Sequence, residues 1–335
     1  MVMTIRLEKI IERTAVLDPR SGFEEFAQEV EVRFDPLTGA SSRINITRAG
    51  RPKQQMSRAE EPVPKNCPFC PENIERDTPK FTRGFDPEGR IRCGGATVFP
   101  NLFPLSGIHG VCAFTPEHKL DLDRFTEAEA ADGLFAAAEF ARRSAAAGAK
   151  FHFLGWNHLP PAGASILHPH FQIIASSRPA AAVAVCHSAS EAYMGREGRS
   201  FWADYAEEER GSARFIGGRG GFEWFAPWSP TCGYEVLGIC SSQASSLLDL
   251  DDGGVRGLAG GIVRLLRGYW KIGVASVNMG VYSWPERCGG FSLNVRLAGR
   301  PISGASDKAF LEIFGGETGL PVAPEGYAPL LRREF

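Results

Sequence analysis

Long hydrophobic runs, a strong net charge and a high density of cysteine are all missing from this chain of 335 residues. No stretch of eighteen apolar residues occurs, so the sequence predicts no transmembrane helix and no membrane partner. A formal net charge of −2 and a pI near 6.4 favour neither nucleic acid nor an anionic membrane surface as a partner. Eight cysteines are too few for a disulfide scaffold. The segment Met1–Val16 carries scattered charges and no apolar core, so we expect no signal peptide and a cytoplasmic protein.

The most informative stretch is the one in which two histidines and a glutamine alternate with apolar residues. A core strand is predicted over Leu167–Ala175, which ends in an apolar run. Because successive side chains of a strand point to opposite faces, His168, His170 and Gln172 would share one face. An imidazole is a competent nucleophile toward phosphorus near neutral pH. Histidines merely satisfied within a core are the alternative, but three polar groups in register argue against it.

A loop of small residues precedes that strand. Gly163 and Ala164 allow a close approach of the backbone, and Ser165 adds a hydroxyl. Backbone N–H groups and hydroxyls at such a position are suited to phosphate oxygens. We therefore expect this loop to contact a phosphate.

A second signal is the pair of cysteines in Cys67-Pro-Phe-Cys70. This C-x-x-C spacing is typical of zinc sites. No second C-x-x-C and no local pair of histidines follows, so two further ligands must come from the fold. The best candidates are His118, which follows an apolar run, and one histidine of the strand pair. A reduced structural or redox pair is the alternative.

Several weaker motifs occur in a fixed order along most of the chain. They are Arg33–Gly39, Thr47–Pro52, Cys67–Asn73, Val98–Pro104 and Phe114–His118. Together with the histidine strand they resemble the galactose-1-phosphate uridylyltransferases and their nucleotidyltransferase relatives in the histidine-triad superfamily. The resemblance implies four zinc ligands, namely Cys67, Cys70, His118 and His168. It also implies that His170 becomes nucleotidylated while Gln172 holds a phosphate oxygen. A closed site with four protein ligands would make Zn²⁺ structural.

The resemblance also suggests how substrate is bound. Arg48 and Arg51 resemble the family's phosphate-binding arginines, although a solvated basic loop is the alternative. In the family this arginine loop commonly reaches into the active site of a neighbouring subunit, so we expect a homodimer. Ser165 is expected to act with His170 and Gln172 in catalysis. Other candidates for contacts with the substrate are Asn101, Asn157, Gly163, Asn294 and Glu312.

The fold class that we expect is α+β, with duplicated histidine-triad-like units, antiparallel sheets and packed helices. In the first unit, a Thr126-x-x-Glu129 capping box predicts a helix to about Ala147, followed by two strands. The second unit repeats this order. Its expected elements are a helix to about residue 269 and strands over 274–282 and 291–297. We expect a catalytic unit over 1–186, a linker over 187–221 and a degenerate, sugar-phosphate-binding unit over 222–335.

The second unit lacks the chemistry of the first. Its counterpart of the histidine strand carries Ser292, Asn294 and Arg296. No histidine follows His187, so the additional metal site that some family members build on C-terminal histidines cannot form here. The second unit is therefore expected to bind substrate without providing a nucleophile.

The resulting hypothesis is a nucleotidyltransferase that exchanges a nucleoside monophosphate between a nucleotide sugar and a sugar 1-phosphate or phosphate, as in galactose metabolism. Gln172 stands where the family's hydrolases have a third histidine, and an amide cannot donate a proton as an imidazolium does, which favours transfer over hydrolysis. Leu102 stands where uridylyltransferases typically place an Asp, and Asn-Leu-Phe-Pro resembles the ADP-glucose phosphorylase branch more. The alternatives are an ADP-glucose or dinucleoside polyphosphate phosphorylase, a nucleotide hydrolase, and a zinc-stabilised nucleotide-binding protein without turnover.

Overall fold

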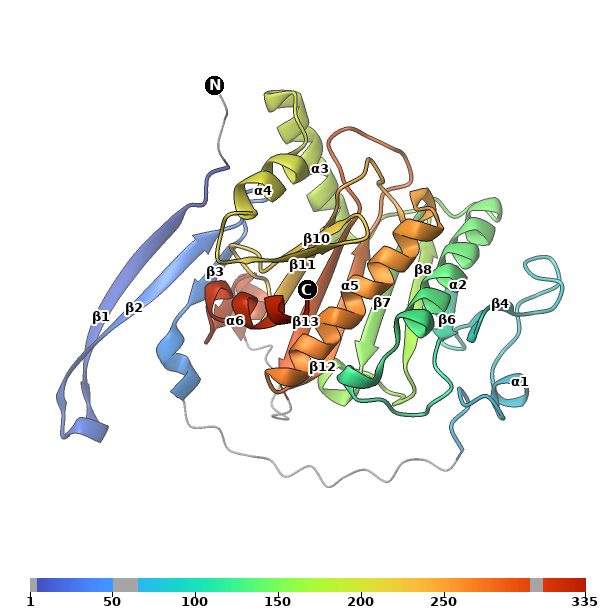
Figure 1. The fold of residues 1–335 in the computed structure, drawn as a ribbon, viewed down its shortest axis with the longest axis horizontal. Helices are drawn as coiled ribbons and strands as arrows, with labels where there is room; N and C mark the ends of the chain where they lie inside the picture. Colours follow the sequence, from blue (N-terminus) through green and yellow to red (C-terminus); the bar gives the residue numbers. More distant parts are fainter. Residues whose placement is uncertain (1–4, 51–65, 302–309) are drawn as a thin grey trace.

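Two sheets organise the computed structural model, which describes residues 5–50, 66–301 and 310–335 (Figure 1). The smaller sheet contains, in spatial order, β1 (Lys9–Asp18), β2 (Glu24–Phe34), β3 (Ser41–Ile44) and β14 (Thr318–Leu320). The larger sheet contains, in spatial order, β4 (Ile91–Cys93), β5 (Ala96–Pro100), β6 (Ile108–Ala113), β8 (His170–Ser176), β7 (Phe151–His158), β12 (Val274–Tyr282), β13 (Asn294–Pro301), β11 (Glu235–Cys240), β10 (Phe222–Phe225) and β9 (Phe215–Arg219).

Helices fill the connections between these strands. The α-helices of the described residues are α1 (Ile74–Asp77), α2 (Glu127–Ala146), α3 (Ala181–Glu197), α4 (Phe201–Glu209), α5 (Asp252–Lys271) and α6 (Pro324–Leu331). Short single-turn helices are η1 (Pro19–Ser21), η2 (Ile46–Gly50), η3 (Leu122–Arg124), η4 (Pro160–Ala162), η5 (Leu247–Asp249), η6 (Leu311–Gly315) and η7 (Arg332–Glu334). Within the described ranges, no helix has the length and apolar character needed to cross a membrane.

The strand order of the larger sheet is mirrored about its centre. Five strands of the first half and five of the second meet where β7 pairs antiparallel with β12, with Gly155 opposite Gly280. On either side of that junction, β8 corresponds to β13 and β6 to β11. The α+β fold class with antiparallel sheets is confirmed. The boundaries of the two units stay a prediction, and the segment expected to be a linker contains most of α3 and the whole of α4 and β9.

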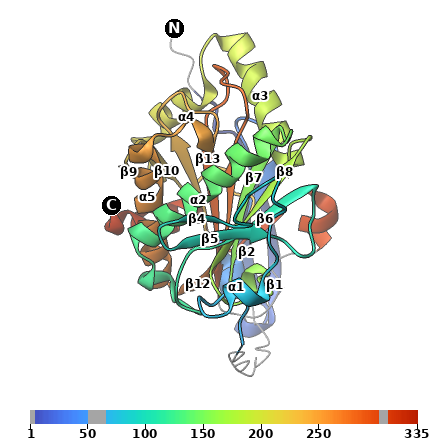
Figure 2. The same ribbon diagram turned by 90° about the vertical axis from the view of Figure 1, so that its right-hand side faces the viewer.

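Helices α2 and α5 lie side by side across one face of the larger sheet (Figures 1 and 2). The predicted capping box begins α2, because the Thr126 side chain accepts from the Glu129 N–H and the Glu129 side chain from the Thr126 N–H. Asp251 caps α5 in a similar way by accepting from Gly254. Their apolar stripes, including the fully buried Leu134, pack on the strands. Burial of each such side chain contributes about 1.5–3 kcal/mol.

The opposite face of the sheet is covered only in part. Helices α3 and α4 pack a separate apolar cluster over β11 and β10. Phe69, before α1, and Ile74, the first residue of α1, pack over β5 and β6. Between these covers, side chains of β8, β7 and β12 alternate between buried and half-buried. The half-buried face of these three strands therefore carries the side chains that can meet a ligand.

The histidine strand begins later than the sequence predicts. β8 starts at His170 rather than at Leu167, because Pro169 has no N–H to donate to a neighbouring strand. His168 therefore precedes the ladder, although its side chain stays buried beside it. Phe171 and Ile173 face the helices as expected, which leaves His170 and Gln172 on the other face.

Candidate functional site

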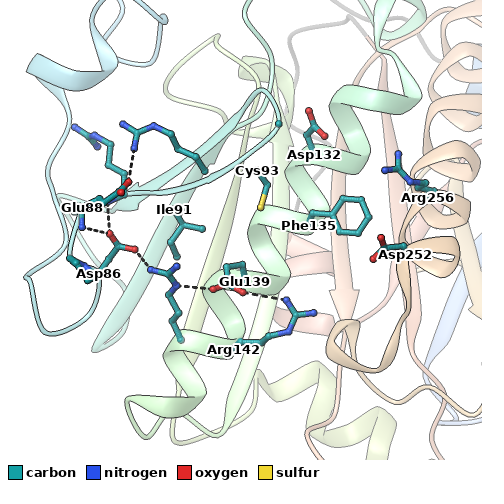
Figure 3. Close-up of a pocket in the computed structure, with 15 residues that line it drawn as sticks. Asp86, Glu88, Ile91, Cys93, Asp132, Phe135, Glu139, Arg142, Asp252 and Arg256 are labelled. Carbon is teal, nitrogen blue, oxygen red and sulfur yellow. Dashed lines mark hydrogen bonds and ion pairs between the residues drawn. The ribbon is translucent and has the colours of Figure 1, made fainter.

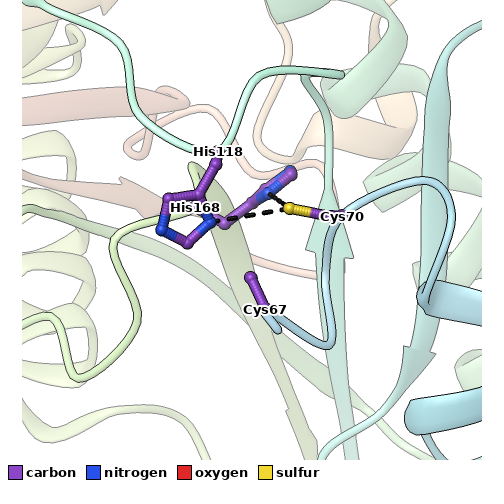
Figure 4. Close-up of side chains that lie close together, drawn as sticks. All are labelled: Cys67, Cys70, His118 and His168. Carbon is purple, nitrogen blue, oxygen red and sulfur yellow. Dashed lines mark hydrogen bonds between the residues drawn. The ribbon is translucent and has the colours of Figure 1, made fainter. Parts of the chain in front are cut away.

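The structure brings the four expected metal ligands together (Figure 4). The donor atoms of Cys67, Cys70, His118 and His168 all lie within 4.8 Å of one another. Cys70 Sγ is 3.6 Å from His118 Nδ1 and 3.7 Å from His168 Nδ1. Zinc bond lengths of about 2.3 Å to sulfur and about 2.05 Å to nitrogen at a tetrahedral angle separate such atoms by roughly 3.6 Å. The residues therefore fit a tetrahedral zinc ion.

A tight turn aims the two sulfur atoms. The Cys67 carbonyl accepts from the Cys70 N–H at 3.3 Å and from Asn73 Nδ2 at 2.9 Å, and Cys67 Sγ accepts from the Phe69 N–H at 3.4 Å. Burial and the neighbouring Cys67 raise the pKa of the Cys70 thiol to about 11. Two thiolates are therefore stable here only beside a cation.

The orientation of His168 also suits a metal ligand. Its Nε2 donates to the Thr115 carbonyl at 2.9 Å, since a carbonyl can only accept, so the lone pair of Nδ1 faces the cysteines. Burial lowers the pKa of His168 to about 4. The ring is therefore neutral at physiological pH, which is the form that binds metals.

His170 lies next to this cluster with one ring nitrogen in use. Nδ1 donates to the His168 carbonyl at 2.8 Å, so the proton sits on Nδ1 and Nε2 keeps its lone pair. The side chain is 6% exposed and meets the edge of the Phe69 ring at 5.2 Å. Burial lowers the pKa of His170, opposed by the hydrogen bond to His168. The imidazole is thus neutral, oriented and chemically a nucleophile.

Gln172 lies two residues further along the same face. It stands opposite Val111 of β6 and Gly155 of β7. His109, buried on the same face of β6, accepts the Leu105 N–H on Nδ1 at 3.1 Å and therefore carries its proton on Nε2. That Nε2 is buried without a well-formed hydrogen bond among the described residues. The Gln172 amide beside it opposes the lowering of the His109 pKa by burial.

His109 was not predicted as a site residue. Its signal in the sequence is a polar residue inside the apolar run Ile108–Ala113, placed so that it shares a face with Gln172 across the ladder. Detecting that signal requires the pairing of β6 with β8. The sequence alone does not provide this long-range register.

The loop before β8 is strained and tied to the second half of the chain. Leu159 adopts φ 65° and ψ 164°, a conformation that residues other than glycine rarely adopt. Asn278 Nδ2 donates to the Ala162 carbonyl and to Asn157 Oδ1, both at 2.8 Å, and its Oδ1 accepts from Arg300 at 2.7 Å. A residue of β12 therefore positions the expected phosphate loop.

Two backbone N–H groups of that loop donate to carbonyls within the loop itself. Gly163 has φ +86°, and its N–H donates to the Pro160 carbonyl at 2.8 Å. The Ala164 N–H donates to the Leu159 carbonyl at 3.2 Å. In this conformation the exposed Ser165, with its hydroxyl and N–H, is the better placed donor of the loop.

Asn101 lies at the end of β5 with its side chain engaged in a turn. Its N–H donates to the His109 carbonyl, and its Oδ1 accepts from the Phe103 N–H, both at 2.8 Å. The turn leaves Leu102 67% and Phe103 81% exposed. These apolar side chains are therefore open to a further partner.

Three of the expected substrate contacts do not lie beside His170 in the same chain. Arg48 in η2 and Glu312 in η6 belong to the region of the smaller sheet, which Figure 1 shows apart from β6 and β8. Glu312 Oε1 accepts from the Gly319 N–H at 3.1 Å. Asn294 is fully buried, with Nδ2 donating to the Ser292 carbonyl. Arg51 lies outside the described residues.

Similarity to known proteins was tested in sequence and in structure. No family model matches the chain. An uncharacterised protein of Archaeoglobus fulgidus is 29% identical over 310 residues, which cover 90% of this chain and 92% of that protein. An ADP-glucose phosphorylase from Arabidopsis thaliana with bound ADP-glucose superimposes with a TM-score of 0.74 at 19% identity, covering 90% of this chain and 98% of that chain. This chain has the uridylyltransferase fold.

Two further solved structures share the uridylyltransferase fold with this chain. A uridylyltransferase superimposes with a TM-score of 0.70 at 22% identity, covering 90% of this chain and 97% of that chain. A GalT-like protein from Arabidopsis thaliana gives 0.72 at 20% identity, with 90% and 98% covered. The resemblance inferred from the sequence is therefore confirmed at the level of the fold.

On this uridylyltransferase fold, an open cleft of about 810 Å³ lies away from the histidines, between β4 and helices α2 and α5 (Figure 3). Acidic and basic side chains alternate along it and several of them are paired, as Arg143 is with Asp86 and Glu139. None of the expected site residues lines it. The candidate site is therefore the half-buried face of β8, and this cleft is a separate feature of the surface.

Proposed function

We propose that the protein is a nucleotidyltransferase that moves a nucleoside monophosphate between a nucleotide sugar and a sugar 1-phosphate or inorganic phosphate. The observation that carries this proposal is the state of His170, a buried, neutral imidazole whose Nδ1 is held by the His168 carbonyl. The same ring abuts a Cys/His cluster that fits zinc. Both features lie on a fold shared with an ADP-glucose phosphorylase and a uridylyltransferase.

In the first half-reaction, His170 Nε2 attacks the α-phosphorus of the nucleotide sugar. The new bond joins nitrogen to phosphorus, and the bond from phosphorus to the bridging oxygen breaks, so that sugar 1-phosphate leaves with the electron pair. The Nδ1–H bond to the His168 carbonyl stabilises the positive charge that the ring acquires. In the second half-reaction an oxygen of the acceptor phosphate attacks the same phosphorus and restores neutral His170.

The surrounding groups orient the reacting phosphate. Gln172, on the same face as His170, is suited to donate to a nonbridging oxygen, and Ser165 is suited to a second one. Zinc held by Cys67, Cys70, His118 and His168 would have no open coordination position, so its contribution is structural. It would fix His168 and, through that residue's carbonyl, the ring of His170.

The separated candidates support a homodimer with a shared site. Arg48 and Glu312 both lie in the region of the smaller sheet, apart from the histidines of the same chain (Figure 1). Arg48 is exposed in the middle of η2. In a dimer, these groups of one protomer would complete the phosphate and sugar contacts of its partner. Sedimentation as a fully active monomer would contradict this arrangement.

Between the two nucleotides, we propose adenylyl transfer from ADP-glucose rather than uridylyl transfer. The turn at Asn101 presents the apolar Leu102 and Phe103 rather than a carboxylate that could accept from ribose hydroxyls. A solved relative on this fold is an ADP-glucose phosphorylase with bound ADP-glucose. Phosphorolysis of a dinucleoside polyphosphate is the second candidate. Hydrolysis is disfavoured because Gln172 cannot serve as a proton donor.

The proposed location is the cytoplasm. All eight cysteines are free thiols, as expected in a reducing compartment. The proposed substrates belong to nucleotide-sugar metabolism, of which galactose metabolism is one branch. Fractionation of the source cells followed by immunodetection tests this assignment.

Intact-protein mass spectrometry after exposure to ADP-glucose or UDP-glucose without acceptor tests the function. We expect a covalent adduct whose mass identifies the nucleotide and which disappears on addition of phosphate or sugar 1-phosphate. Digestion should locate the adduct on His170. A protein that binds either nucleotide sugar without forming any adduct would be a binding protein, and the proposal would fail.

A further inference from the structure

A second cluster of metal-binding side chains lies outside the site described above. His187 and Glu191 are four residues apart on α3, so they share one face of that helix. Cys288 comes from the loop between β12 and β13. One donor atom of each residue lies within 4.8 Å of the others, and Cys288 Sγ is 3.6 Å from His187 Nε2.

The ring of His187 is held in place by stacking. It lies on the Trp284 ring at a centroid distance of 3.6 Å and an interplanar angle of 11°. Trp284 is itself fixed, because its backbone N–H donates to the Ser245 carbonyl at 2.8 Å and its ring centroid lies 5.0 Å from that of Phe151. Nε2 is thereby directed at the cysteine before any ligand arrives, which lowers the entropic cost of binding.

The loop carrying Cys288 approaches α3 so closely that only glycine fits. A Cβ atom on Gly290 would lie 2.3 Å from Glu191 Oε1 and 2.9 Å from the Ser190 carbonyl oxygen. Real Cβ atoms do not come that near to other atoms. The glycine at position 290 therefore allows the loop to lie against α3, which brings the Cys288 thiol close to the helix.

One carboxylate oxygen of Glu191 has no hydrogen-bond partner in the cluster. That atom, Oε1, is buried, and among the described residues no donor hydrogen-bonds it. A buried carboxylate oxygen without a donor or a cation is costly. A positive charge placed between the three side chains would compensate it.

The donor set indicates which ion would bind. One sulfur, one nitrogen and one carboxylate oxygen suit Zn²⁺, whereas Ca²⁺ and Mg²⁺ take oxygen ligands. The separation of 3.6 Å between Cys288 Sγ and His187 Nε2 equals the one between Cys70 Sγ and His118 Nδ1 in the first cluster. It matches a tetrahedral zinc ion, and the half-buried side chains leave a path for entry.

We propose that His187, Glu191 and Cys288 form a second zinc site with one coordination position open to solvent. It would join α3 to the β12–β13 loop and so connect the region after the first unit to the second unit. Trp284 packs on Phe151, at the start of β7, whereas His158 at the end of β7 lies near His170. The eight residues of β7 separate the two ends by roughly 23 Å. The second site is therefore separate from the nucleophile.

Metal analysis of the purified full-length protein is the first test. Saturation with Zn²⁺ followed by desalting should leave two equivalents in the wild type and one in Cys288→Ala, Glu191→Gln or His187→Ala. Cys93→Ala, which removes a half-buried cysteine outside both clusters, should keep two. One equivalent in the wild type, or two in each of the three variants, would overturn the proposal.

A labelling experiment on the wild type avoids any folding defect of the variants. With limiting iodoacetamide, zinc should slow alkylation of Cys288 by at least about tenfold, since the thiolate is a ligand, and a chelator should reverse this. Cys93 in the same molecule should react at a constant rate. Equal reaction of Cys288 with and without zinc would overturn the proposal. The nucleotidyl adduct on His170 should form in either case, which separates this test from that of the proposed function.

Discussion

The two halves of the larger sheet place different residues on corresponding strands. In the first half, Gln172 of β8 stands opposite Gly155 of β7. In the second half, Arg296 of β13 stands opposite Gly280 of β12. Two residues earlier stand His170 in the first half and Asn294 in the second. The same backbone arrangement thus holds the proposed nucleophile in one half and an amide in the other.

What differs is the chemical type of the polar groups and the way in which they are paired. In the second half, Arg296 donates to Glu235 at 2.8 Å and lies over the Tyr282 ring, and Asn294, which is fully buried, donates to the Ser292 carbonyl; Arg296 Nε and Asn294 Oδ1 have no hydrogen-bond partner among the described residues. In the first half, no described residue hydrogen-bonds His170 Nε2, and Gln172 is half-buried. The duplicated framework is thus the same in both halves, but only the first half places on it an imidazole that can act as a nucleophile.

The largest expected effect comes from replacing His170 by asparagine, the residue that stands at the corresponding position 294 of the second half. His170→Asn should form no nucleotidyl adduct and should lower turnover by more than about 10³-fold, because no nucleophile remains. Adduct mass and exchange of label between hexose 1-phosphate and nucleotide sugar measure this. The converse change, Asn294→His, should gain no adduct, because that position has no exposed surface at all, whereas His170 keeps 6% of its surface exposed. Exchange at the wild-type rate in His170→Asn would end the proposed mechanism.

Removal of a metal ligand should have the next largest effect. Cys67→Ser should cost one zinc equivalent and at least about 3 kcal/mol of unfolding free energy, because structural zinc contributes to folding. Urea unfolding together with metal analysis tests this, and Cys93→Ser serves as the matched control. Full metal content in Cys67→Ser would contradict the ligand assignment.

The stability of the first half should depend more on acid pH than that of the second. His158 lies three residues after Gly155, and the corresponding residue of the second half, three residues after Gly280, is Ser283. His158 is 1% exposed, and burial lowers its pKa to about 4. Between about pH 6.5 and pH 4 the unfolded chain binds a proton that the folded one does not, so stability falls as pH falls. The loss approaches roughly 3 kcal/mol.

Urea unfolding at pH 7.5 and pH 4.5 measures that loss. His158→Phe should show a smaller difference between the two pH values than the wild type. An unchanged difference would mean that His158 is not the responsible group.

Loss of the amide on β8 should be milder than loss of the nucleophile. Gln172→Ala should still form the adduct, about 10²-fold more slowly, because one donor to the transition state is removed while the covalent route remains. Rapid-mixing kinetics of adduct formation measure the rate. A complete absence of adduct would give Gln172 a larger role than orientation.

The smallest effect tests the connection between the halves. Asn278→Ala removes the two hydrogen bonds from β12 to Ala162 and Asn157. Each such bond contributes about 1 kcal/mol, so we expect turnover to fall by about tenfold through a looser phosphate loop. The Michaelis constant and turnover number should both change. Ser283→Ala, on the same segment but outside this contact, should leave them unaltered.

Local rules account for most of what was predicted correctly. Side-chain alternation placed His170 and Gln172 on one face, and the capping box located the start of α2 to the residue. Strand β12 has the predicted bounds. The errors in strand limits are small and have local causes, such as the missing N–H of Pro169 at the start of β8.

Residues that depend on distant contacts were less accessible. The importance of His109 depends on which strand pairs with β6, and the loop tether depends on β12 lying beside β7. The segment expected to be a linker contains most of α3, which brings His187 to Cys288, a residue about a hundred positions away. No periodicity within one segment encodes such a contact.

The sequence by itself therefore determined the fold class and the order of the repeated elements, and it singled out the candidate nucleophile and the four candidate ligands, because each follows from spacing within a short segment or from a set of motifs in order. Only the tertiary structure decided which ring nitrogen of His170 is left for chemistry, where the loop before β8 is anchored, and that Arg48 lies apart from the histidines of its own chain. These depend on contacts between residues far apart in the chain, and such contacts form only when the sheets and helices have packed together.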